Sequence, residues 1–166
     1  EAIAHFENVY RSTRHRFFSV SKEATKQLLQ AVYCLGFCYC ELCLFEKAFY
    51  YLNMVKSTGD IHHAMEYVNV LANSGDLRVF KEIETIVDDV RQQFPDDDDL
   101  PEHVQKLLSF LKRRHGYSLI EFGKLDEAEK VFKSLLDDPT SQDYAVSELA
   151  YIQKLKANES PESSEA

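Results

Sequence analysis

The fold is decided by residues 28–60, LLQAVYCLGFCYCELCLFEKAFYYLNMVKSTGD. Apolar side chains recur there every three or four residues, at Leu28, Val32, Leu35, Tyr39, Leu42 and Phe45. This period is typical of an amphipathic helix and predicts one over 21–44. A second helix is predicted over 46–56, and the turn-forming sequence STGD at 57–60 ends it. Two helices joined by so short a connection are expected to pack antiparallel.

The same alternation of helix and turn continues along the chain. Further helices are predicted over 61–73, 77–93 and 102–122, another follows the turn at 123–126 and ends at 136, and a last one spans 141–156. In the last helix the residues expected to be buried are Tyr144, Leu149, Ile152 and Leu155. The opening Ala2, Phe6 and Val9 predict part of a further unit over 1–18. Residues 157–166 carry no apolar anchor, which predicts disorder.

Two windows of the chain share one spacing of small and large residues. The first contains Gly36, Tyr39, Ala48 and Leu52, and the second contains Gly116, Leu119, Ala128 and Phe132. Both windows cross a predicted turn, and Gly and Ala at these places let the two helices approach closely. A third window, 61–94, departs from the spacing because it has Val68 in place of Gly and Phe80 in place of Ala.

This spacing resembles that of the tetratricopeptide repeat (TPR) family, whose unit of about 34 residues places a Gly, a large residue, an Ala and an aromatic at these intervals. The resemblance implies an all-α fold of about seven or eight helices, in which antiparallel pairs form a right-handed superhelix, an α-α solenoid. It covers a single domain over 1–156, with a partial unit at 1–18, units at 21–60, 61–94 and 102–139, and a final helix at 141–156.

Composition and charge limit the function. The chain has 166 residues, of which 45% are hydrophobic, and only 5 Gly and 4 Pro, too few for the turns of a β-sandwich. The net charge of −9 disfavours non-specific binding to nucleic acid or to an anionic membrane. Much of this acidity lies in Asp96–Asp99 and in Glu159, Glu162 and Glu165. The rest of the chain carries local basic clusters, so acidic protein segments are candidate partners.

The four cysteines, Cys34, Cys38, Cys40 and Cys43, lie within ten residues of one predicted helix. On a helix the first two and the last two point in roughly opposite directions, so one tetrahedral zinc ion cannot reach all four. We therefore expect no metal, and four free thiols favour a reducing compartment, the cytoplasm. The chain begins without Met or an export signal, so part of a longer cytoplasmic protein is expected.

Known catalytic motifs are absent from the sequence: it has no nucleophile elbow, zinc-protease motif or phosphate loop. Adjacent side chains of a helix diverge by about 100°, so His62 and His63 are expected to be structural. The run Asp96–Asp99 lacks the alternating ligands of a calcium loop. Neither an enzyme nor a cofactor is therefore expected.

The resemblance implies that the first helix of each unit lines a groove for a partner peptide or helix. The groove candidates that it assigns are Tyr33, Phe37, Glu41, His62, Glu66, Asn69, Asn73, Arg113, Arg114, Tyr117 and Glu121. Family members that bind the acidic C-termini of chaperones use Lys, Asn and Arg, which Tyr33 and Phe37 do not supply. We expect instead a groove with an aromatic end and a basic end in a non-catalytic interaction scaffold. The alternatives are a sensor that binds a small ligand in the groove and a module that self-associates into a homo-oligomer.

Overall fold

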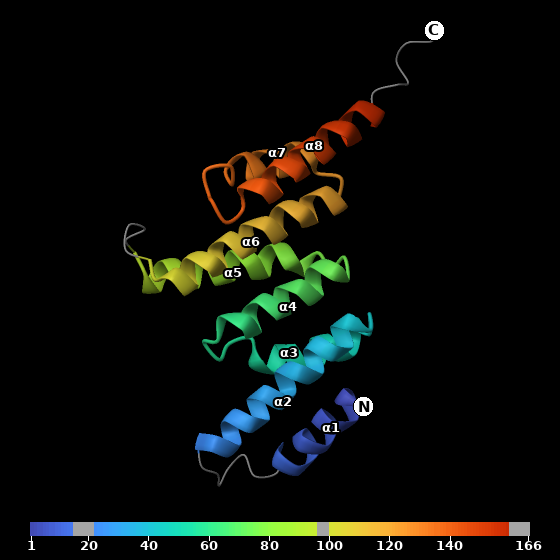
Figure 1. The fold of residues 1–166 in the computed structure, drawn as a ribbon, viewed down its shortest axis with the longest axis vertical. Helices are drawn as coiled ribbons and strands as arrows, with labels where there is room; N and C mark the ends of the chain where they lie inside the picture. Colours follow the sequence, from blue (N-terminus) through green and yellow to red (C-terminus); the bar gives the residue numbers. More distant parts are fainter. Residues whose placement is uncertain (15–21, 96–99, 160–166) are drawn as a thin grey trace. The chain divides into compact units, whose positions relative to one another are not determined.

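The computed structural model describes residues 1–14, 22–95 and 100–159, and eight α-helices lie in these ranges (Figure 1). The described residues contain no β-strand, so the predicted all-α class is confirmed. Contacts between the helices divide the chain into two compact units, Glu1–Ser74 and Gly75–Ala166. The boundary falls within the window 61–94, in which Val68 and Phe80 replace the Gly and Ala of the other two windows.

The first unit contains α1 (Ala2–Thr13), α2 (Lys22–Glu41), α3 (Phe45–Val55) and α4 (Ile61–Asn73). Helix α2 packs against the other three, and α3 also packs against α4. Buried apolar side chains fill the space between them, among them Leu35, Leu52, Val55, Val68 and Leu71. Helix α1 is held to the rest by the Tyr39 hydroxyl, which donates to Glu7 Oε1 at 2.9 Å.

The second unit contains α5 (Arg78–Gln93), α6 (Glu102–Glu121), α7 (Leu125–Lys133) and α8 (Gln142–Glu159). Each helix packs against the next one along the chain, as Figure 1 shows. Its buried cluster is formed by Leu119, Ile120, Leu125, Ala128, Phe132, Leu135, Ala145 and Ile152. The two units therefore repeat one order of elements, in which a leading helix is followed by a close pair and a fourth helix.

The two close pairs, α2–α3 and α6–α7, depend on glycine. A Cβ added at Gly36 would lie 2.6 Å from Leu52 Cδ2, and one added at Gly116 would lie 2.7 Å from Phe132 Cζ. Real Cβ atoms essentially never come that close to another heavy atom. Leu52 and Phe132 are completely buried. The close approach predicted from the shared spacing is thus confirmed for both pairs.

The end of α2 differs from the prediction. The helix ends at Glu41 rather than at residue 44, and Leu42 is 57% exposed instead of buried. The amide of Leu44 donates to the carbonyl of Tyr39 at 2.9 Å, which closes a helix-ending turn with Cys43 at a φ of +55°. At the end of α6 the same turn has Gly123 at a φ of +71°. Cysteine rarely adopts this backbone conformation, so the sequence did not signal the helix end.

Other boundaries also shift. Helix α7 was predicted to start after residue 126 and to end at 136, but it spans Leu125–Lys133. A turn follows its end, where the Leu136 amide donates to Lys133 O at 3.3 Å. Helix α8 runs to Glu159, so residues 157–159, predicted to be disordered, are helical. The predictions for 15–18, Asp96–Asp99 and 160–166 lie outside the described residues.

The glycine contacts predict a stability change. The substitution Gly116→Ala should lower the free energy of unfolding by up to about 2 kcal/mol. The overlap of the new methyl group with the Phe132 ring costs about 1–3 kcal/mol, and the greater helix propensity of Ala offsets roughly 1 kcal/mol of it. Gly36→Ala should act in the same direction. Urea denaturation measures both, with Asn53→Ala on the exposed side of α3 as the control. Wild-type stability for both glycine variants would contradict the close approach.

The left-handed backbone of Cys43 predicts a gain in stability when glycine replaces this residue. Cys43→Gly should raise the free energy of unfolding by about 1 kcal/mol, because a left-handed backbone costs roughly 1–2 kcal/mol for residues other than Gly. Gly123→Ala, the reverse substitution in the equivalent turn, should lower it by a similar amount. Thermal and urea unfolding compare the two variants, and a loss of stability in Cys43→Gly would show that the turn is not strained.

Candidate functional site

The predicted binding residues of the first unit lie on two neighbouring helices. Tyr33, Phe37 and Glu41 belong to α2, and His62, Glu66, Asn69 and Asn73 belong to α4. Tyr33 packs against His63 with ring centroids 5.0 Å apart, and Asn73 Nδ2 lies 3.9 Å from Cys40 Sγ, which brings the two helices together. We call the residues that flank this junction, Tyr33, Phe37, Glu66, Asn69 and Asn73, the α2–α4 face.

Polar groups are buried within the α2–α4 face. Glu66 is only 9% exposed and accepts a hydrogen bond from Asn69 Nδ2 at 3.1 Å. Asn69 Oδ1 is shielded from solvent and has no donor among the described residues. Burial and the Glu66 charge together raise the pKa of Tyr33, and they raise the pKa of Cys40 to about 11. The face therefore combines a buried carboxylate with an acceptor that lacks a hydrogen bond.

The two adjacent histidines have different environments. His62 is exposed, whereas His63 is 6% exposed and its Nδ1 lies 2.7 Å from Thr58 Oγ1. Burial lowers the pKa of His63, so its ring is neutral at neutral pH. The hydrogen bond and the Tyr33 ring hold His63 in place, which gives it a structural role at the start of α4.

The predicted residues of the second unit, Arg113, Arg114, Tyr117 and Glu121, lie on α6. Arg113 Nη1 donates to Ser141 Oγ at 2.7 Å, and one turn earlier the Ser109 hydroxyl donates to Asp138 Oδ2 at 2.6 Å. These two bonds tie α6 to the segment that precedes α8. Arg114 lies over the Phe110 ring, with its guanidinium carbon 5.8 Å from the ring centroid.

Helix α8 adds two residues that the sequence did not assign to a site, Tyr144 and Glu148. Burial and the Glu148 charge raise the pKa of Tyr144, and the positive charge of Arg114 opposes them. Burial also raises the pKa of Glu148. Tyr144 is 38% exposed, so the prediction that it belongs to the core is wrong: its ring packs against Phe132 with the centroids 6.1 Å apart, and part of the side chain stays exposed. We call Arg113, Arg114, Tyr117, Tyr144 and Glu148 the α6–α8 face.

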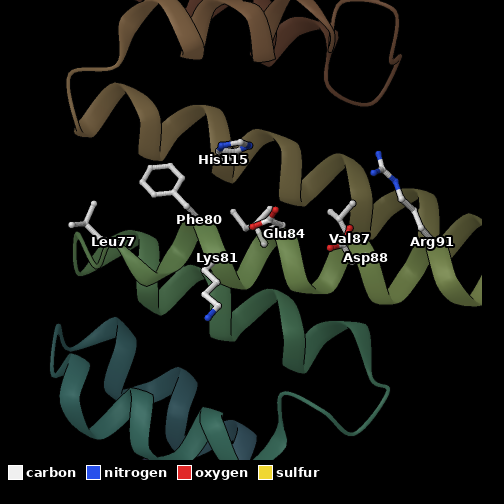
Figure 2. Close-up of a pocket in the computed structure, with 9 residues that line it drawn as sticks. Leu77, Phe80, Lys81, Glu84, Val87, Asp88, Arg91 and His115 are labelled. Carbon is white, nitrogen blue, oxygen red and sulfur yellow. The ribbon is translucent and has the colours of Figure 1, made fainter.

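The largest of the hollows described lies along α5, where no site was predicted (Figure 2). It has a volume of about 740 Å³, and its lining, which we call the α5 groove, consists of Leu77, Phe80, Lys81, Ile83, Glu84, Val87, Asp88, Arg91 and His115. Figure 2 shows Leu77, Phe80 and His115 toward one end and Arg91 at the other. Leu77, at the start of the groove, is 65% exposed.

Two smaller hollows occur in the first unit. One, of about 460 Å³, lies on α3 at Glu46, Phe49, Tyr50, Asn53 and Met54. The other, of about 330 Å³, lies between α1 and α2 and has an apolar lining from Phe6, Val9 and Ala31. Neither hollow brings together an acid, a base and a nucleophile of the kind that a catalytic site needs.

Metal-binding groups do not gather in the described part of the chain, where no three His, Cys, Asp or Glu side chains lie close enough to hold an ion. All four cysteines are free thiols, with Cys40 buried and Cys43 exposed. Within the described ranges, every helix is too short or too polar to span a membrane.

The bonds of Asp138 predict an acid-dependent stability. Burial opposes ionisation of this carboxyl, but hydrogen bonds from Ser109 and Thr140 outweigh it and lower the pKa of Asp138 from 3.8 to about 2. The stabilisation is complete above about pH 4 and is lost as the pH falls toward 2. Asp138→Asn should lower the free energy of unfolding by about 1 kcal/mol at neutral pH, since solvent screens this partly exposed group.

Urea denaturation at neutral pH, near pH 4 and below pH 3 measures this effect. The control is Asp137→Asn, which removes the neighbouring exposed carboxylate. Asp138→Asn should lose stability less steeply between pH 4 and 2 than the wild type, whereas Asp137→Asn should follow the wild type. If both variants showed the wild-type acid dependence, the bonds to Asp138 would not stabilise the fold.

Comparison with known proteins identifies no relative: no protein-family model, no curated protein and no solved structure matches the chain. The resemblance to the TPR family therefore stays a prediction that depends on the spacing of Gly, Ala and large residues. The α2–α4 face, the α6–α8 face and the α5 groove have to be interpreted from their own side chains.

Proposed function

We propose that this chain is a non-catalytic protein-interaction module of TPR-like helix pairs, which binds segments of a partner protein on the α2–α4 and α6–α8 faces. The architecture is part of the proposal, including the right-handed superhelix that such pairs form in the TPR family. It is supported by the two glycine contacts, Gly36 with Leu52 and Gly116 with Phe132, and by the matching turns at Cys43 and Gly123.

The observation that carries the functional proposal is the exposure of large aromatic side chains on both faces. Phe37 is 42% exposed on the α2–α4 face, and Tyr144 is 38% exposed on the α6–α8 face. Tyr144 lies near the charged side chains of Arg114 and Glu148. Aromatic rings surrounded by polar groups supply most of the binding energy in protein interfaces. The two faces thus have the composition of interface centres.

The α6–α8 face favours an acidic segment. Arg113 uses one of its donors on Ser141, and Arg114 contacts the Phe110 ring, so both guanidinium groups retain donors for a carboxylate. Arginine binds carboxylates with two parallel hydrogen bonds, which fixes the orientation of the bound group. Tyr117 and Tyr144 lie beside these charges and would cover the apolar part of the same segment.

The α2–α4 face favours a segment that donates hydrogen bonds. Glu66 is an acceptor, and Asn69 Oδ1 has no donor among the described residues. A buried acceptor without a partner costs about 1–3 kcal/mol, so a bound amide or ammonium group would recover part of that energy after a small rotation of the Asn69 side chain. The exposed Phe37 ring would cover the apolar side chains of the bound segment.

A selection from displayed random peptides tests the function. The wild-type chain should enrich peptides that combine acidic and apolar residues, and their affinity should fall as salt is added. Arg114→Glu should weaken these peptides about tenfold or more, because it replaces a favourable charge pair with a repulsive one. Isothermal titration calorimetry with the enriched peptides measures the loss.

The matched control is Lys130→Glu, which makes the same change of charge at an exposed position of α7 outside both faces. This variant should bind the enriched peptides like the wild type. Failure to enrich any peptide would contradict the interaction function. Enriched peptides that bound Arg114→Glu and the wild type equally would contradict the role of the α6–α8 face.

A further inference from the structure

The α5 groove follows a second stripe along α5, next to the stripe that faces the core, and its Phe80 packs against the buried cluster. The stripe consists of residues three or four positions apart, Leu77, Phe80, Lys81, Glu84, Val87, Asp88 and Arg91. Val79 belongs to the other stripe and is buried, whereas Ile83 is buried but also contributes to the lining of the groove. At about 1.5 Å per residue, the stripe is about 21 Å long, the length of a four-turn helix.

The apolar floor of the groove is already formed. Phe80 packs against Phe122 and His115 with ring centroids 5.6 Å away in each case, and the Lys124 ammonium lies 5.8 Å from its centroid. These contacts fix the Phe80 ring, while Leu77 beside it is 65% exposed. A partner would therefore bind a rigid surface and would lose little entropy to its ordering.

The charges on the groove follow a symmetrical order along α5. Lys81 is basic, Glu84 and Asp88 are acidic, and Arg91 is basic. Within the described part of the chain, none of these four side chains makes a salt bridge. Their spacing of three, four and three residues matches the spacing of side chains along one face of another helix.

We propose that the α5 groove binds an amphipathic α-helix of another protein, whose apolar stripe covers Leu77, Phe80 and Val87 and whose charges run in the order acidic, basic, basic, acidic. Such a helix pairs each of its charges with an opposite charge on α5. Its apolar side chains fill the hollow of about 740 Å³. Binding of an amphipathic helix in a groove is an established mode of protein recognition, in which residues three and four apart act as anchors.

The charge order argues against other occupants. A second copy of α5 aligned in register would place like charges together in either direction: antiparallel, Lys81 would meet Arg91 and Glu84 would meet Asp88. A parallel copy would place each charged residue beside the same residue of the other copy. Phosphate groups of a nucleic acid or of a membrane surface would be repelled by Glu84 and Asp88, which occupy the middle of the groove.

Two synthetic helical peptides of identical composition test this inference. Both carry leucines at the apolar stripe positions and four charges at the three-, four- and three-residue spacing. One has the order acidic, basic, basic, acidic, and the other has the opposite sign at each position: basic, acidic, acidic, basic. Fluorescence anisotropy with the full chain should give an affinity about tenfold higher for the first peptide, as expected for two or more partly exposed charge pairs. Equal affinities, or no binding of either peptide at millimolar concentration, would overturn the proposal.

Variants of the chain make the test specific to the groove. The combined substitution Lys81→Glu, Glu84→Lys, Asp88→Lys and Arg91→Glu inverts the sign of all four charges without changing net charge, so the variant should prefer the other peptide. Leu77→Asp should abolish the binding of both. Circular dichroism monitors folding of each variant, and the comparison of the two peptides on the wild type does not depend on any variant.

Two further outcomes separate this inference from others. Arg114→Glu, which alters the α6–α8 face, should leave peptide binding to the groove unchanged, so the groove and the proposed function can fail independently. In sedimentation equilibrium, the wild type and Leu77→Asp should have the same oligomeric state. A wild-type dimer that Leu77→Asp disrupts would mean that a second copy covers the groove, and it would overturn the assignment to a helix of another protein.

Discussion

The structure depends on two places where a helix backbone contacts a large side chain of the next helix. At Gly36 and Gly116 the absence of a Cβ atom lets Leu52 and Phe132 reach the backbone of α2 and α6. Because protein interiors are close-packed, this contact sets the distance between the two helices of each pair. It also sets the positions of the small buried residues beside it, Ala48 and Ala128. Once each pair is fixed, α4 and α8 pack on the second helix of the pair, and the faces described above follow.

The proposed binding faces lie on the sides of the helices that this packing leaves uncovered. In both units the first helix of the pair turns its glycine toward the second helix and contacts the fourth helix or the segment before it with a larger side chain. Tyr33 meets His63 in the first unit, and Arg113 meets Ser141 in the second. One backbone arrangement thus presents an amide and carboxylate surface in one unit and a guanidinium and phenol surface in the other. The chemistry of the surface varies while the packing contact is repeated.

The sequence predicted the helices and the close pairs, because a period of three to four residues and the Gly–Ala spacing are direct consequences of packing. It did not predict the end of α2, since nothing in a cysteine indicates the left-handed backbone of Cys43. Tyr144 was wrongly placed in the core because an aromatic residue at helical spacing has the same pattern whether it is covered or only half covered. The α5 groove was missed because Leu77 and Phe80 fit the core period too. The charges of Lys81, Glu84, Asp88 and Arg91 at the same spacing were the available signal of a second stripe.

The order of helix contacts has a consequence for how the chain folds. The helix pairs with the most extensive contacts join neighbours along the chain. The contacts of α2 with α4, and of α6 with α8 through Arg114 and Tyr144, each skip one helix. Chains dominated by such local contacts fold quickly, because little loop entropy is lost before each contact forms. Each unit also contains its own glycine contact and its own buried cluster. During synthesis the first unit is therefore able to close its core before the second has been made. Little apolar surface then stays exposed while the chain is incomplete.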